Sequence, residues 1–385
     1  MTPSARPVDL RVLDLATLHE RRSDKWTGHD DDVLVATIAE MDFPLAEPVA
    51  EALRAAIDRS DLGYAPPATR RLRDAFAGFA RRRLRWDVDS DQITLVPDVM
   101  VGLVELSRVL TGPDGTVAFV TPAYPPFFTA LPHAVARLEH ITAGEDGAVD
   151  LEALAGSIAG GTRVLILTNP HNPTGRVLPR SELEAIAELC AEREVWVLAD
   201  EIHAPLLLPG TEHTAWLEVS DASRACGIAL TSASKAFNLV GLKAALLVTA
   251  SDRMRGVVAG LPDLTDQVGL LGVVAAEAAF AEGDEWLDAV LAQLDANRSL
   301  LGERLAAEAP PIRWQPPGAS YLAWLDCRKL GLGDDPAQHF LKRGRVALSP
   351  GLDYGREGAG FARLNFGTSP DLVAEAVRRI RSALR

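Results

Sequence analysis

Short apolar runs alternate with helical stretches through the middle of the chain, and this alternation limits the possible folds most strongly. The runs are rich in Val, Leu, Ile and Ala, and they lie at 93–96, 116–120, 163–168, 195–199, 227–231 and 244–249. Such runs, separated by helical patterns, are typical of a mostly parallel sheet with helices on both faces. We therefore predict an α/β fold with a three-layer, mostly parallel central sheet.

The sequence after residue 285 has a different character. A long amphipathic helix pattern at 286–308 is followed by strand-like runs at 321–325, 346–349 and 362–366, and then by a helix pattern at 371–384. A chain of 385 residues has room for two or three domains. We predict a large domain at 46–285 and a smaller α+β domain built from 1–45 and 286–385.

Composition and charge argue against several classes of protein. The net charge of −14 argues against a nucleic-acid partner, and no apolar run reaches the roughly 18 residues that a membrane helix needs. The three cysteines are far apart and odd in number, so we expect no disulfide framework and no bound metal. Because the start of the chain has no apolar signal region, a cytoplasmic protein with reduced thiols fits best.

Polar motifs follow three of the predicted strands, where ligands gather in folds of this kind. Lys235 comes after the run 227–231 and has small hydroxyl neighbours. Desolvation there would make its amine nucleophilic toward aldehydes, although a surface lysine is the alternative. Asp200 ends the run 195–199 and could pair with a protonated pyridine nitrogen, cap a helix or bind a metal.

Four further positions have both a functional and a purely structural explanation. His203 could touch a ring hydroxyl or be a satisfied loop histidine. The loop 169–175, stiffened by two prolines, could present an amide to a phenolate or carboxylate, or be a simple turn. Tyr124 could stack on a ring or pack in the core. Arg363 interrupts an apolar strand, so it needs a carboxylate from a substrate or from an internal salt bridge.

Taken together, these motifs resemble the fold-type I pyridoxal-phosphate enzymes of the aminotransferase class I and II superfamily. Within it, the chain is similar to the MalY/PatB-type cystathionine β-lyase branch. The resemblance runs nearly from end to end and implies an aspartate aminotransferase-like large domain that binds the cofactor. It rests on Arg22–Trp26, Ala39–Pro44, Gly63-Tyr64, Asn169–Gly175, Asp200–His203, Ser234–Leu239 and Arg363–Asn365.

The resemblance implies roles for the residues at the matching positions. Lys235 is expected to hold pyridoxal 5′-phosphate as a Schiff base and then to move the Cα proton. Asp200 is expected to pair with the pyridine nitrogen, and Tyr124 to stack on the ring, which makes these three the expected catalytic residues. Asn172 and His203 are expected to approach the ring oxygen.

The resemblance also implies contacts to the phosphate and to the substrate. Tyr64 is expected to reach the phosphate of the neighbouring subunit in a homodimer. The substrate carboxylate is expected to lie between Arg363, Asn172 and the backbone near Ala39. Within the same subunit, the phosphate is expected to contact the backbone amides of Val99 and Met100, the hydroxyl of Ser232 and the amine of Lys243.

At three positions the residue differs from the one that is usual in the family. Lys243 stands eight residues after Lys235, where arginine is common, so it keeps the charge but loses the fork-shaped guanidinium. Asp98 stands where glycine is common, and it either places a carboxylate beside the phosphate or caps the following helix. Glu40 replaces a more frequent aspartate.

The resemblance implies α,β-elimination from an S-substituted L-cysteine such as cystathionine, with thiol, pyruvate and ammonia as products. A class I and II aminotransferase is the alternative, because both reactions begin with removal of the same Cα proton. A regulatory protein that retains the fold without turnover is a further alternative. The presence of Lys235, Asp200 and Arg363 argues against it.

Overall fold

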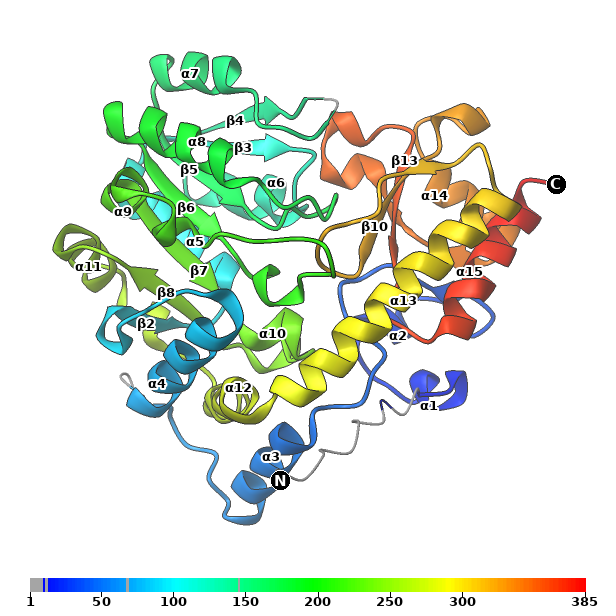
Figure 1. Cartoon of the computed structure of the whole chain (residues 1–385), viewed down its shortest axis with the longest axis horizontal. Coiled ribbons are helices and arrows are strands. Elements are labelled where there is room, and N and C mark those ends of the chain that lie inside the picture. Colours follow the sequence, from blue (N-terminus) through cyan, green and yellow to red (C-terminus); the bar gives the residue numbers. More distant parts are fainter. Residues whose placement is uncertain (1–9, 11–12, 67–68, 145) are drawn as a thin grey trace.

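The computed structural model describes residue 10 and residues 13–66, 69–144 and 146–385. Residues 1–9, 11 and 12 of the predicted small domain lie outside the described residues. A seven-stranded sheet forms the centre of the larger part of the molecule (Figure 1). Its strands are β2 (Ile93–Val96), β3 (Thr116–Thr121), β4 (Arg137–Thr142), β5 (Thr162–Thr168), β6 (Trp196–Asp200), β7 (Gly227–Thr231) and β8 (Ala245–Thr249).

The strand order is β2-β8-β7-β6-β5-β3-β4, and only β8 runs antiparallel to its neighbours within this sheet. The predicted mostly parallel sheet is therefore confirmed. Side chains alternate between its faces as strand geometry requires. In β3, Val117 and Phe119 join one apolar cluster, while Ala118 and Val120 join the other.

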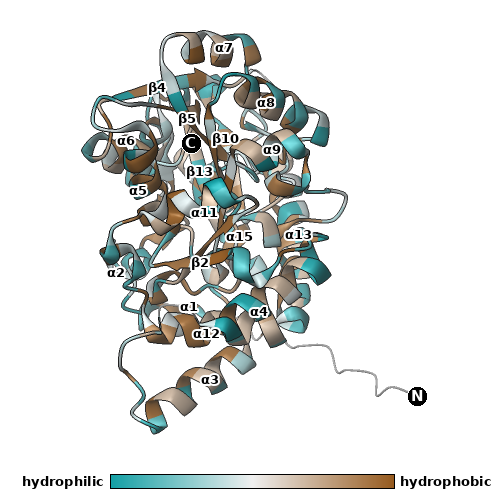
Figure 2. Ribbon diagram, turned by 90° about the vertical axis from the view of Figure 1, so that its left-hand side faces the viewer, coloured by the Kyte–Doolittle hydropathy of each residue, from teal (hydrophilic) through white to brown (hydrophobic). Residues whose placement is uncertain are grey.

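Helices cover both faces, which confirms the three-layer α/β fold. One face packs against α5 (Val99–Thr111), α6 (Pro126–Ala130) and α11 (Asp252–Ala259). The other face packs against α7 (Leu151–Ala159), α8 (Arg180–Glu192), α9 (Asp221–Cys226) and α12 (Leu270–Glu282). Figure 2 shows hydrophobic colour along β2 and hydrophilic colour on parts of α13 (Asp284–Glu308).

A second group of strands lies beside this sheet. A four-stranded sheet has the order β12-β13-β10-β9, and β1 pairs with β11 in a separate parallel pair. The long helix α13 runs from α12 towards α15 (Figure 1). The bounds are β1 (Leu34–Val35), β9 (Arg313–Trp314), β10 (Leu322–Asp326), β11 (Val346–Ala347), β12 (Ser349–Pro350), β13 (Phe361–Asn365), α13 (Asp284–Glu308), α14 (Pro336–His339) and α15 (Pro370–Ala383).

The pairing of Leu34 with Val346 brings the N-terminal segment against the C-terminal part of the chain. This contact supports the predicted small domain, whose boundaries stay a prediction. The remaining helices are α1 (Leu15–His19), α2 (Asp24–Thr27), α3 (Glu47–Asp58), α4 (Arg70–Phe79) and α10 (Ala233–Ala236), with π-helical turns at Ala80–Leu84 and Phe340–Gly344.

One predicted strand was wrong in its extent. The run 346–349 was expected to be one strand, but Val346–Ala347 pairs with β1 while Ser349–Pro350 pairs with β13. The two halves of the run therefore belong to two different sheets. This division depends on where β1 and β13 lie in space. An apolar pattern of four residues does not carry that information.

Three buried cysteines, Cys190, Cys226 and Cys327, are free thiols. No helix in the described part of the chain is long and apolar enough to span a membrane. Among the described residues, no group of three or more His, Cys, Asp or Glu side chains is placed to hold a metal ion.

We expect Phe280→Ala to lower the melting temperature markedly. Phe280 is fully buried, and its ring lies 5.2 Å from Phe76 and 5.0 Å from Phe79, measured between centroids. Loss of a buried phenylalanine costs about 3–5 kcal/mol of stability. Thermal unfolding checks this, with Leu264→Ala as the control because Leu264 is 78% exposed. An equal shift in both variants would contradict the assignment of this aromatic cluster to the core.

Candidate active site

The polar motifs predicted after separate strands meet at one edge of the large sheet. β5, β6 and β7 are adjacent and parallel, with Thr168 opposite Asp200 in the register. The backbone N–H of Asn169 donates to the carbonyl of Asp200 at 3.0 Å. The carboxyl ends of the three strands therefore place Asn169, Asp200 and Lys235 on neighbouring segments.

Lys235 lies on α10, the single turn that follows β7. The hydroxyl of Ser232 accepts from the Ser234 N–H at 3.0 Å and so begins this helix. Lys235 Nζ donates to the Ala39 carbonyl at 3.1 Å. Burial lowers the pKa of Lys235 to about 8, and the nearby charge of Arg363 acts in the same direction. The amine is therefore readily available in its neutral, nucleophilic form.

Asp200 ends β6 and is buried. Its carboxylate accepts from the Ile202 N–H at 3.2 Å. Burial raises the pKa of Asp200 to about 6, while this hydrogen bond and the charge of Lys235 oppose the rise. A carboxylate in such surroundings gains from a cationic partner, such as a protonated ring nitrogen.

His203 is buried and neutral. Burial, together with the charges of Lys235 and Arg363, lowers its pKa to about 3. Its Nδ1 lies 3.0 Å from the Ser320 hydroxyl. The two alternatives for His203 are compatible, because a satisfied neutral ring still has Nε2 to offer to a ligand.

Arg363, on β13, is buried without an ion-pair partner among the described residues. One guanidinium nitrogen donates to Asn172 Oδ1 at 3.0 Å, and the other lies 3.4 Å from the Thr37 carbonyl and from the Ser349 hydroxyl. Its Nε is buried with no hydrogen-bond partner. The internal salt bridge considered for Arg363 is thus not formed, which leaves this cation available to a ligand carboxylate.

The N-terminal segment 37–42 passes through the site. The Ala39 carbonyl accepts from both Lys235 Nζ and the Tyr321 hydroxyl, the latter at 3.0 Å. Burial raises the pKa of Tyr321, so it stays a neutral donor. Sequence reasoning missed Tyr321, and its only signal was its position at the start of the run 321–325.

Two asparagines fix this segment and were also missed as site residues. Asn238 exchanges two hydrogen bonds of 2.8 Å with the backbone of Met41. Asn365 donates to the carbonyls of Ile38 and Glu40 at 2.6 and 2.7 Å. Both asparagines belong to motifs on which the family resemblance rests, but the sequence of a motif does not show which groups its asparagine binds.

A buried ion pair supports the segment from the other side. Lys25 Nζ lies 2.8 Å from both carboxylate oxygens of Asp42, and Trp26 Nε1 donates to the same carboxylate at 3.2 Å. Lys25 also donates to the Glu40 carbonyl at 3.2 Å. These contacts bring Arg22–Trp26 and Ala39–Pro44, two motifs of the family resemblance, side by side.

Three of the residues expected to contact a phosphate lie at the start of α5. Val99 and Met100 open this helix, and Lys243 lies beside it. Asp98 Oδ1 accepts from the Met100 N–H at 2.8 Å, and its Oδ2 lies 2.8 Å from Lys243 Nζ. Ser232 donates to the Ala244 carbonyl at 2.7 Å. Asp98 is thus both a helix cap and the ion-pair partner of Lys243.

The two tyrosines predicted at the site differ in their surroundings. Tyr124 follows β3, and burial raises its pKa to about 12, with a further contribution from Asp98. Tyr64 is 93% exposed and does not join the site of its own chain. A role for Tyr64 therefore requires a second subunit.

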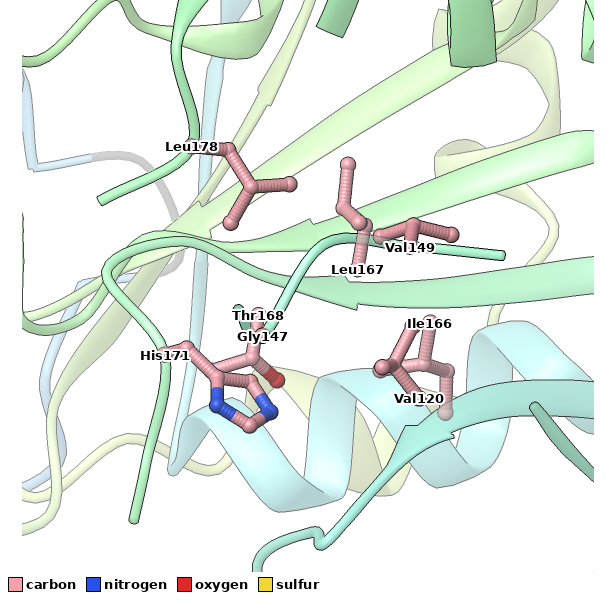
Figure 3. A pocket seen from close by; sticks show the side chains of 8 residues that line it. All are labelled: Val120, Gly147, Val149, Ile166, Leu167, Thr168, His171 and Leu178. Atoms are coloured by element: carbon pink, nitrogen blue, oxygen red, sulfur yellow. The ribbon is translucent and has the colours of Figure 1, made fainter. Parts of the chain in front are cut away.

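A cavity beside the loop 169–175 is not this site. Its volume is about 10 Å³, which holds at most one water molecule. Figure 3 shows it between His171 and apolar side chains that include Val120, Val149 and Leu178. Burial and the charge of Arg176 lower the pKa of His171 to about 4, so this histidine is a neutral packing residue.

Comparisons with known proteins match most of the length of the chain. A family model described as aminotransferase class I and II matches residues 32–380. A candidate cystathionine beta-lyase of Mycobacterium tuberculosis is 41% identical, with 98% of each chain covered. The cystathionine beta-lyase PatB of Bacillus subtilis is 35% identical, with 92% of this chain and 93% of PatB covered.

A solved structure is also similar. It is that of a candidate PLP-dependent beta-cystathionase from Corynebacterium diphtheriae. It superposes with a TM-score of 0.93 at 33% identity, over 97% of this chain and 99% of that chain.

We expect Lys235 to react with small aldehydes at lower pH than an exposed lysine. Its pKa of about 8 makes the amine neutral above that pH. Reductive methylation of the cofactor-free protein, followed by peptide mass mapping, should give a half-maximal rate near pH 8. Exposed Lys329 serves as the internal reference. Arg363→Gln should move the midpoint to higher pH, because it removes a neighbouring positive charge. A wild-type midpoint equal to that of Lys329 would contradict the burial of this amine.

Proposed function

The chain belongs to the aminotransferase class I and II family, and we propose that it is a pyridoxal-phosphate-dependent carbon–sulfur β-lyase. It cleaves S-substituted L-cysteines of the cystathionine type to thiol, pyruvate and ammonia. The observation that carries this proposal is the similarity to cystathionine beta-lyases over nearly the whole chain. Lys235, buried Asp200 and Arg363, which has no ion-pair partner among the described residues, supply the groups that this chemistry needs.

The residues of the site fit pyridoxal 5′-phosphate. An amine with a pKa of about 8 has the neutral fraction that reaction with an aldehyde requires. Asp200 supplies a buried carboxylate for a protonated pyridine nitrogen, and neutral His203 supplies a ring nitrogen for the phenolic oxygen. Tyr124, partly buried after β3, supplies an aromatic face.

When bound, pyridoxal phosphate withdraws electrons from Cα of an amino acid and so stabilises negative charge there. Lys235 Nζ acts as the general base that accepts the Cα proton. The Ala39 carbonyl, which is 3.1 Å from Nζ, orients this amine. Lys235 can then return the proton to the departing thiolate, whose sulfur keeps the electron pair of the broken Cβ–S bond.

Arg363 and Asn172 hold the substrate carboxylate in this proposal. The 3.0 Å hydrogen bond from Arg363 to Asn172 fixes the plane of the guanidinium, and buried Nε has no partner within the described residues. A carboxylate bound there orients Cα towards Lys235. The backbone near Ala39 completes this side of the substrate site.

We further propose a homodimer in which Tyr64 reaches the phosphate of the neighbouring site. Tyr64 is 93% exposed, and Ile57 and Leu62 nearby are 57% and 61% exposed. They lie on and just after α3, which projects from the body in Figure 2. Exposed apolar side chains gathered in this way are typical of a protein interface.

Two broader predictions remain part of the proposal. The three cysteines are odd in number and buried as free thiols, which supports a reducing, cytoplasmic location. The division into a large domain at 46–285 and a small domain at 1–45 with 286–385 is supported by the pairing of β1 with β11.

Incubation with cystathionine should release thiol and pyruvate in equal amounts without an added keto acid. A thiol reagent and lactate dehydrogenase measure the two products. Lys235→Ala should lower the rate by about 100- to 10,000-fold, the range for loss of a general base. Lys329→Ala, at an exposed position, is the control. Amino transfer that depends on a keto acid, without thiol release, would establish transamination instead.

Mixing two impaired variants tests the role of Tyr64. Tyr64→Ala and Lys235→Ala should each lower lyase activity, and co-refolded mixtures should regain part of it. If Tyr64 acts across the interface, each mixed dimer contains one site with both native residues. Light scattering and mass spectrometry confirm that mixed dimers form. Mixed dimers that regain no activity would contradict a contribution across the interface.

A further inference from the structure

Asp98 lies between the end of β2 and the first turn of α5, where it makes two charge-assisted contacts. Its Oδ1 accepts from the Met100 N–H at 2.8 Å, and its Oδ2 pairs with Lys243 Nζ at 2.8 Å. Its side chain is 29% exposed, and that of Lys243 is 56% exposed. The carboxylate therefore bridges a helix N-terminus and a lysine, the two kinds of group that bind phosphate.

These donors are the same ones that the proposed function assigns to the cofactor phosphate. Lys243 is the only cation assigned to that phosphate, and Asp98 already neutralises it. A phosphate that binds at the start of α5 must either displace the Asp98 carboxylate or lie beside it. In both cases the bound phosphate meets a negative charge that a glycine would not supply.

The charge of Asp98 also acts on the rest of the site. It raises the pKa of Tyr124 and of Asp200, and it opposes the lowering of the Lys235 pKa. These effects place the carboxylate within electrostatic reach of the groups that surround the cofactor ring. Asp98 is thus part of the site and not a remote helix cap.

We propose that Asp98 is an internal anion that competes with the cofactor phosphate for the Met100 amide and Lys243, and so weakens phosphate binding. This inference rests on the proposed function, because it takes the start of α5 as the phosphate site. Asp98 keeps Lys243 and the helix end satisfied when no phosphate is present. It also disfavours the more highly charged form of the phosphate.

Asp98→Asn separates this role from helix capping. Asparagine caps helices about as well as aspartate, so the contact to the Met100 N–H survives while the charge is lost. A matched control is Asp150→Asn, because Asp150 caps α7 through the Ala153 N–H at 2.9 Å. Equal melting temperatures of wild type and both variants would show that the helices remain intact.

The experiment compares binding of pyridoxal 5′-phosphate with binding of pyridoxal, which lacks the phosphate, to the cofactor-free protein by quenching of tryptophan fluorescence. Asp98→Asn should raise the ratio of the affinity for the phosphorylated compound to the affinity for pyridoxal about five- to tenfold, as for removal of one nearby like charge. The ratio cancels the effect that Asp98 has on the Lys235 amine in both ligands. Phosphorus NMR of the bound cofactor should show the phosphate titrating at lower pH in Asp98→Asn than in wild type. Asp150→Asn should change neither measurement.

Two outcomes would overturn different claims. If the ratio of the two affinities is no higher in Asp98→Asn than in wild type, Asp98 does not compete and serves instead to position Lys243. If wild type binds pyridoxal and its phosphate equally well, the start of α5 is not a phosphate site, and that part of the proposed function fails. Failure to bind either compound would contradict the cofactor itself.

Discussion

Lys235 and Arg363 are two basic side chains within electrostatic reach of each other, and neither has an ion-pair partner among the described residues. Arg363 has amide, carbonyl and hydroxyl partners, and Lys235 has a backbone carbonyl. Burial and the mutual effect of the two charges favour a neutral Lys235 amine. The same conditions favour a carboxylate at Arg363, so a substrate anion would satisfy the guanidinium, whose buried Nε has no hydrogen-bond partner among the described residues.

The segment 37–42 contacts both Lys235 and Arg363 and links them to the rest of the molecule. It lies between Lys235 and Arg363 and offers its carbonyls to both. Asn238, from the end of the large sheet, and Asn365, from the small sheet, hold its backbone. The buried pair of Lys25 with Asp42 supports it from behind. The site is therefore shared between segments that are far apart in the sequence, and movement of either sheet would change it.

The predicted fold and site were recovered to different degrees. Strands such as Ile93–Val96 and Gly227–Thr231 were confirmed to the residue, because an apolar run bounded by turn residues is a local signal. The run 346–349 was not confirmed as one strand, because Val346–Ala347 pairs with β1 and Ser349–Pro350 pairs with β13. Tyr321 was missed because its contact, the Ala39 carbonyl, lies 282 residues away.

The sequence by itself determined the chemical groups and their order: an asparagine, a carboxylate and a lysine, each at or shortly after the end of an apolar strand, and an arginine inside a late one. Their strands had to be parallel neighbours for these groups to meet, and periodicity predicts that without stating distances. Only the tertiary structure decided that Arg363 lacks an ion-pair partner among the described residues, and that Asp98 forms an ion pair with Lys243. Asp98 and Lys243 are 145 residues apart, and Arg363 and Asn172 are 191 residues apart. Whether such side chains are charged depends on their burial, and burial depends on how the whole chain folds.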